Sequence, residues 1–166
     1  MEKFNLRLIL FFLMFMILSS CKTKDENNSQ SQPDYVKLET GVREMFSYSS
    51  EVFKNRDLEG LVNRFTTDGT LKTPNNPLVK GIGAIRKFYQ GALQLEDFKL
   101  DLKVTKVDIS KAGDMAYALA EFSLSYQTPG GLIHDSGNTL IVFKRVDDTW
   151  KIASENLSSG PIDNSK

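Results

Sequence analysis

The hydrophobic period of this sequence changes near Leu95, and the change limits the folds that the chain can adopt. Before Leu95, apolar residues recur every three or four positions, which is the period of an amphipathic helix. After it, apolar and polar residues alternate, as in strands with one face in water. We therefore predict helices first and most of the strands afterwards. The predicted helices cover residues 35–55, a short segment from Leu58, and residues 81–93; the predicted strands cover 66–73, 98–109, 115–127, 135–146 and 149–158.

Short turn sequences separate the last four predicted strands, so these strands should form an antiparallel meander. The turns are Gly113-Asp114, Thr128-Pro129-Gly130-Gly131 and Asp147-Asp148. In the first of these strands the apolar phase slips after Val104, which predicts a β-bulge near Thr105 and Lys106. Asp57 is the predicted N-cap of the short helix. The elements predict an α+β domain over residues 35–160, with three helices covering one face of an antiparallel sheet of about four main strands.

Residues 1–20 have the layout of a secretory signal peptide. Lys3 and Arg7 precede eleven residues, 8–18, that have no polar side chain. This run is shorter than the roughly 20 apolar residues that a spanning helix needs. Leu18-Ser19-Ser20-Cys21 resembles the lipobox of bacterial lipoproteins, in which the cysteine carries lipid and begins the mature protein. The resemblance implies a protein of the bacterial cell envelope that is anchored to a membrane through lipidated Cys21, on either the periplasmic or the surface face of the outer membrane.

Residues 21–34 should form a flexible polar tether, because the twelve residues after Cys21 include no apolar side chain that could repay the entropy of ordering. Within them, Lys24-Asp25-Glu26 resembles a signal that sends some Gram-negative lipoproteins to the outer face of the outer membrane. The alternative is that these charges only keep the tether solvated. Residues 161–166 are expected to be a disordered tail.

The composition excludes several classes of function. The chain has 21 basic and 21 acidic side chains, whereas a nucleic-acid-binding protein needs a basic excess. One cysteine and one histidine cannot supply a disulfide framework or a Cys/His zinc site. Gly81-Ile82-Gly83 lacks the third glycine of a dinucleotide-binding motif. We therefore expect no metal, no cofactor and no nucleic-acid partner.

Two motifs carry a resemblance to a known superfamily. They are Arg64-Phe65-Thr66-Thr67-Asp68-Gly69-Thr70-Leu71, and Val79-Lys80-Gly81-Ile82-Gly83-Ala84-Ile85-Arg86-Lys87-Phe88-Tyr89 after a Pro-rich loop. They resemble the SnoaL-like and ketosteroid-isomerase-like branches of the nuclear transport factor 2-like superfamily, and the resemblance runs over about residues 38–158. It implies a cystatin-like, cone-shaped sheet wrapped around the first helix, with an apolar pocket at its open end. It does not imply one activity, because the superfamily holds isomerases, cyclases, dehydratases and proteins without catalysis.

The catalytic positions of the ketosteroid isomerases are not retained. The resemblance places Thr73 where the isomerases have their general-base aspartate, and Ser49 where they have a tyrosine of the oxyanion hole. Their second acid would fall between Thr139 and Phe143, where this sequence has no carboxylate. A threonine hydroxyl cannot act as a base near neutral pH. The only histidine, His134, follows a hairpin and is expected to be a solvated bystander.

Glu155 is the remaining candidate for a catalytic residue. The resemblance places it inside the cone, but Trp150 and Ile152, at the opposite parity, also require burial. Either the strand is covered on both faces or a bulge switches them, and an outward, solvated Glu155 is the alternative. Alternating alanines over residues 116–120 either leave volume for a ligand or admit close packing of the first helix. The other candidates for the pocket lining are Tyr48, Tyr89, Phe122, Tyr126 and Leu157.

Three functional hypotheses follow from these residues. The leading one is a lipid-anchored domain that binds a small apolar molecule or a partner in the cone without catalysis. The second is an enzyme of the isomerase or hydrolyase type that uses Glu155, and the third is an oligomeric interaction domain, such as a homodimer. An inward, desolvated Glu155 with a raised pKa would favour the enzyme, and an exposed one would favour the binding domain.

Overall fold

The structure is a computed structural model, and it describes residues 33–160. The predicted signal peptide, Cys21, most of the predicted tether and residues 161–166 lie outside the described residues, so the interpretations of these segments stay predictions. Over residues 33–160, no helix is both long and apolar enough to cross a membrane.

The three helices lie at the predicted positions. They are α2 (Tyr35–Lys54), α3 (Leu58–Asn63) and α4 (Ile82–Ala92). The predicted N-cap of α3 is confirmed, because Asp57 accepts a hydrogen bond from the backbone N–H of Gly60 at 2.9 Å. Asp34, which the sequence analysis placed in the tether, caps α2 in the same way through the N–H of Lys37.

Six strands form one sheet in the order β2-β1-β6-β5-β4-β3. They are β1 (Phe65–Lys72), β2 (Val79–Lys80), β3 (Glu96–Ile109), β4 (Met115–Thr128), β5 (Gly131–Val146) and β6 (Thr149–Ser159). Strands β3 to β6 form the predicted antiparallel meander, and the predicted bulge lies between Val104 and Lys106. The sheet differs from the prediction in one respect. It is mixed rather than antiparallel throughout, because β1 pairs parallel to β6, and β2 extends it at the edge.

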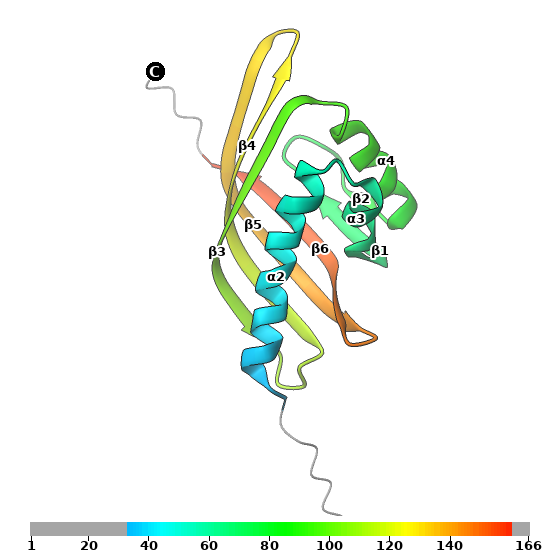
Figure 1. The fold of residues 1–166 in the computed structure, drawn as a ribbon, viewed down its shortest axis with the longest axis vertical. Coiled ribbons are helices and arrows are strands. Elements are labelled where there is room, and N and C mark those ends of the chain that lie inside the picture. The colour runs from blue at the N-terminus through cyan, green and yellow to red at the C-terminus, as the bar shows by residue number, and fades with distance from the viewer. Residues whose placement is uncertain (1–32, 161–166) are drawn as a thin grey trace, which may run out of the picture. The chain divides into compact units, whose positions relative to one another are not determined.

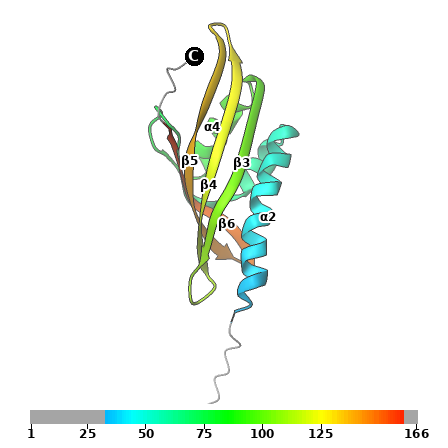
Figure 2. The same ribbon diagram turned by 90° about the vertical axis from the view of Figure 1, so that its left-hand side faces the viewer.

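The core lies between the sheet and helix α2. Figure 1 shows α2 lying along the sheet, with α3 and α4 beside β1 and β2, and Figure 2 shows the other face of β3–β5 without a helix over it. Trp150 fixes the contact, since its Nε1 donates to the Leu38 carbonyl at 3.1 Å. A Cβ on Gly41 would lie 3.1 Å from the Trp150 ring. The alanines at 116–120 belong to the same core as the apolar residues of α2.

A bulge in β6 explains how Trp150, Ile152 and Glu155 are all buried. Phe143 of β5 pairs with Ile152, but the next residue, Val142, pairs with Ser154, so one residue of β6 has no partner at this point. The extra residue moves the inward-facing positions of β6 from even to odd numbers. Of the two explanations left open by the sequence, the structure therefore shows the bulge.

Candidate functional site

A cluster of polar side chains is buried where the helices meet the sheet. It comprises Ser49 of α2, Arg64 at the C-cap of α3, Tyr89 of α4, Thr139 of β5 and Glu155 of β6. We call these five residues the interior cluster. Polar and charged side chains are rarely buried without a partner, so the hydrogen bonds of each member indicate what it can do.

Arg64 is the centre of the cluster, with only 4% of its surface exposed. Its Nη1 donates to the hydroxyl of Ser49, its Nη2 donates to the Tyr89 hydroxyl at 3.3 Å, and its Nε donates to the Leu61 carbonyl at 3.4 Å. The guanidinium carbon also lies 5.8–6.0 Å from the centres of three aromatic rings, which stabilises a buried cation: Phe53, Phe65 and Tyr89. The guanidinium is therefore held rigidly inside the domain.

Glu155 points into the interior and is 8% exposed. Its neighbours across the adjoining strands are apolar, with Ile141 on β5 and Leu71 on β1. Its Oε2 has no hydrogen-bond partner among residues 33–160. Burial raises the pKa of the carboxyl above its ordinary value of 4.5, and the nearby charge of Arg64 opposes that rise. Such a carboxyl can give or take a proton and can hydrogen-bond to a group that enters the interior.

Two hydroxyl groups complete the site. Thr139 is two residues along β5 from the partner of Glu155, and its Oγ1 is buried without a hydrogen-bond partner among the described residues. Burial raises the pKa of Tyr89, partly offset by the charge of Arg64, so the phenol keeps its proton at neutral pH. Because the Tyr89 oxygen accepts from Arg64, its O–H is free to be aimed at another acceptor.

The structure separates the predicted pocket residues. Tyr89, Phe122 and Glu155 are buried, and Leu157 packs partly buried against the core. Tyr126 is half-buried and stacks on Phe98, with the ring centres 6.5 Å apart. Tyr48 is 43% exposed, because it lies on the solvent side of α2, next to the inward Ser49; it is not part of the interior cluster.

The positions that correspond to catalytic residues of ketosteroid isomerases lie in different environments in this structure. Ser49 is a partner of Arg64, and Thr139 has one of the two side-chain oxygens of the interior cluster that are buried without a partner among the described residues. Thr73 follows β1 outside the cluster, where its side chain accepts from Asn76. His134 is exposed, although it lies on β5 rather than in a loop.

Arg64 is the functional residue that the sequence analysis missed. Arg64 belongs to the first of the two family motifs, and a charged side chain is normally expected at the surface rather than in the interior. Helical spacing carries the signal, since Arg64 follows the buried Leu61 by three positions and precedes the buried Phe65. Ser49 is signalled in the same way, three residues after Phe46 and three before Val52 on the buried stripe of α2.

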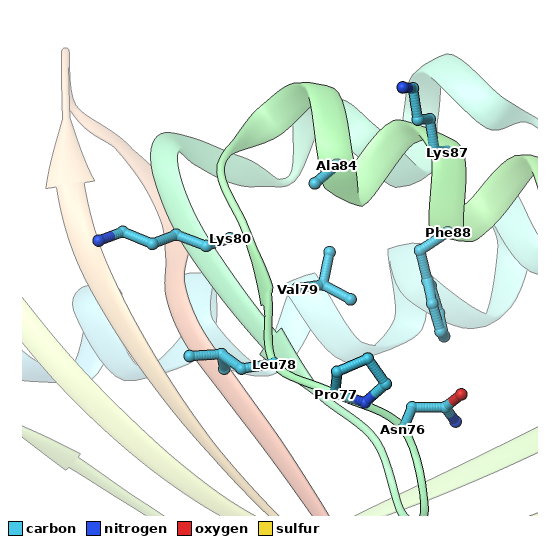
Figure 3. Close-up of a pocket in the computed structure, with 8 residues that line it drawn as sticks. All are labelled: Asn76, Pro77, Leu78, Val79, Lys80, Ala84, Lys87 and Phe88. Atoms are coloured by element: carbon cyan, nitrogen blue, oxygen red, sulfur yellow. The ribbon is translucent and has the colours of Figure 1, made fainter.

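A groove lies on the other side of α4 from the interior cluster. Its volume is about 620 Å³, and Figure 3 shows Lys80 on its β2 side and Lys87 on its α4 side. Phe88 borders the groove, whereas the next residue, Tyr89, points into the interior, with their rings 5.4 Å apart. The remaining residues of the lining are Asn76, Pro77, Leu78, Val79 and Ala84. The groove is a surface feature and holds none of the interior polar groups. Over residues 33–160, the histidine, cysteine and acidic side chains form no group that could hold a metal ion.

The model of the SnoaL-like domain family matches residues 42–163, which are most of the chain. The chain belongs to this family. The match covers α2 from Val42 onward, the other two helices, the sheet and every residue of the interior cluster, so the SnoaL-like fold predicted from the two motifs is confirmed. No curated protein matches the sequence significantly.

Solved structures show the same fold at low sequence identity. A ketosteroid isomerase-like protein from Erwinia carotovora atroseptica is 16% identical, with a TM-score of 0.65 over 74% of this chain and 96% of that one. A candidate dehydratase of the nuclear transport factor 2-like family from Streptomyces avermitilis is 20% identical, with a TM-score of 0.64 over 78% and 99%. A nuclear transport factor 2-like protein with a cystatin-like fold from Novosphingobium aromaticivorans is 15% identical, with a TM-score of 0.63 over 99% and 94%. At these identities the likeness shows the fold: a nuclear transport factor 2-like α+β domain.

Proposed function

We propose that this SnoaL-like domain binds a small, mostly apolar molecule in its interior and exchanges a proton with it through Glu155. The observation that carries the proposal is the Glu155 carboxyl, which is buried, has an oxygen without a hydrogen-bond partner among the described residues, and has a raised pKa. This is the state that distinguishes the enzyme hypothesis from simple binding. A buried carboxyl with a raised pKa favours acid–base chemistry in addition to binding.

The reaction class that fits these groups is isomerisation or the reversible loss of water. In both, a carboxylate removes a proton from carbon next to a carbonyl, and donors stabilise the oxygen on which negative charge develops. Glu155 would be the base, and then the acid that returns the proton. Tyr89 and Arg64 would be the donors near the developing charge. The relatives named as a ketosteroid isomerase-like protein and a candidate dehydratase support this class by analogy only.

Binding without turnover is the second candidate function. It is favoured by the replacement of the isomerase base by Thr73, and by Ser49, which is committed to Arg64 rather than open to a substrate oxygen. In this function, Glu155 and Thr139 would only hydrogen-bond to the ligand.

The two candidates are separated by the Glu155→Gln variant. The chain is purified from its native host, and co-purified small molecules are identified by mass spectrometry and then tested as substrates. The enzyme proposal expects turnover to fall at least a hundredfold in Glu155→Gln and to stay unchanged in Glu44→Gln, a control on the exposed side of α2. Equal turnover in both variants would overturn the catalytic role of Glu155. Retained ligand without turnover in any form would favour the binding domain.

We also propose that the domain is tethered to a membrane of the bacterial cell envelope through lipid on Cys21. The support is the lipobox-like sequence at residues 18–21, which lies outside the described part of the chain. Several acyl chains would hold the domain at the bilayer surface, whereas a single chain binds only marginally.

A further inference from the structure

Arg64 holds a positive charge in the interior without an ion-pair partner among residues 33–160. All three of its hydrogen-bond acceptors are uncharged: two hydroxyl oxygens and one backbone carbonyl. Within residues 33–160, no carboxylate oxygen lies within 4 Å of its nitrogens. A buried charge is costly unless it is paired, and the aromatic rings around Arg64 offset only part of that cost.

The unused donors of Arg64 lie in a site that also holds unsatisfied oxygens. A guanidinium has five N–H groups, and the described contacts use three of them. Glu155 Oε2 on β6 and Thr139 Oγ1 on the neighbouring strand β5 are buried without a hydrogen-bond partner in the described part of the chain. Each unsatisfied buried group costs free energy that a suitably placed ligand would recover.

We propose that the ligand of the interior cluster carries a carboxylate, which accepts hydrogen bonds from Arg64 and Thr139. This inference rests on the function proposed above and names its ligand class: small, mostly apolar carboxylic acids in their ionised form. A carboxylate is the planar two-oxygen acceptor that the guanidinium fork fits best.

The interior favours an anion over its uncharged analogue by a measurable margin. Binding of benzoate and phenylacetate to the full chain, purified in a non-ionic detergent, is compared with binding of benzamide and phenylacetamide by calorimetry at pH 7. We expect each carboxylate to bind at least tenfold more tightly than its amide, which is about 1.4 kcal/mol. In Arg64→Gln this preference should disappear, and in Arg64→Lys part of it should remain. Arg43→Gln, on the exposed side of α2, is the control and should leave it unchanged.

The possible results separate this inference from the function on which it rests. If the amides bind as tightly as the carboxylates, the ligand class is overturned, while the interior remains a small-molecule site. If neither series binds, the inference and the proposed function are both overturned. The comparison on the unchanged chain needs no variant, so it decides the question even if Arg64→Gln does not fold.

Discussion

Glu155 and Arg64 are oppositely charged groups that share one interior without forming a direct ion pair. Arg64 is satisfied by hydroxyl and carbonyl oxygens, whereas Glu155 Oε2 is buried without a hydrogen-bond donor among residues 33–160. Hydrogen-bonding capacity that the fold leaves unused is unfavourable for stability. Unused hydrogen-bonding capacity next to Glu155 and Arg64, which can exchange a proton and bind an anion, is typical of a functional site.

At this scale, the titration of Glu155 predicts a pH dependence of stability. Burial raises its pKa in the folded state, so the folded protein binds more protons than the unfolded one above pH about 4.5. The contribution of Glu155 is therefore fully present at low pH and is lost as pH rises through the raised pKa. We expect Glu155→Gln to gain stability relative to the unchanged chain as pH increases from 4.5 to 8. Urea unfolding of both proteins across this range measures the free energy of unfolding of the variant minus that of the unchanged chain, and a difference that stays constant or falls with pH would contradict a raised pKa.

At the scale of the elements, contacts of α2 and β6 decide which residues become interior. The helical period predicted the bounds of α2 to within a residue, and the alternation of apolar residues predicted the four strands of the meander. The parallel pairing of β1 with β6 was not predictable by periodicity, because the two strands are far apart in sequence and a local pattern carries no information on pairing. For the same reason, the sequence could not decide whether β6 has a bulge or is covered on both faces. The inward position of Glu155 depends on both of these non-local features.

Two glycine substitutions, one at the contact of α2 with β6 and one on α4, should have opposite effects on stability. A Cβ at Gly41 would lie 3.1 Å from the ring of Trp150, which is buried and held by its bond to Leu38. A Cβ on Gly91, near the end of α4, would meet no other side chain within 4 Å. We expect Gly91→Ala to stabilise the domain by about 0.5 kcal/mol through helix propensity, and Gly41→Ala to destabilise it by about 1 kcal/mol. Thermal unfolding compares them, and a stabilising Gly41→Ala would show that α2 and β6 are not tightly packed.

At the scale of the whole molecule, the helix-free face of the sheet is the remaining apolar surface. Leu119 of β4 and Leu140 of β5 are direct cross-strand partners there, and they are 39% and 42% exposed. Met115 lies four residues before Leu119 on the same face of β4 and is also exposed. Clustered exposed apolar residues often mark an interface, which favours the homodimer among the hypotheses drawn from the sequence.

If this face pairs with a second copy, the domain should sediment as a dimer, because the paired faces would bury these leucines. Leu119→Lys should then give a monomer, since it would place a charge in the interface. Ser123→Lys, further along the same face of β4, is a milder control for the added charge. A monomer at all concentrations of the unchanged chain would contradict the homodimer.

The cellular location of the whole chain depends on one residue. If Cys21 is the lipid attachment site, Cys21→Ala should move the protein out of the membrane fraction and abolish labelling by radioactive or clickable fatty acid. The residues of the folded domain are unaffected by this change, so its thermal unfolding should be the same. Unchanged fractionation and labelling would show that the lipobox-like sequence is not used.

If the interior cluster holds a ligand, a crystal structure of the protein purified from its native host should contain that ligand. We predict density for a non-protein molecule beside Glu155 Oε2 and Thr139 Oγ1, with an oxyanion of that molecule within hydrogen-bond distance of Arg64. A structure in which Glu155 instead pairs directly with Arg64, and in which no non-protein molecule lies beside Thr139, would contradict the claim. The cluster would then be a structural ion pair rather than a site.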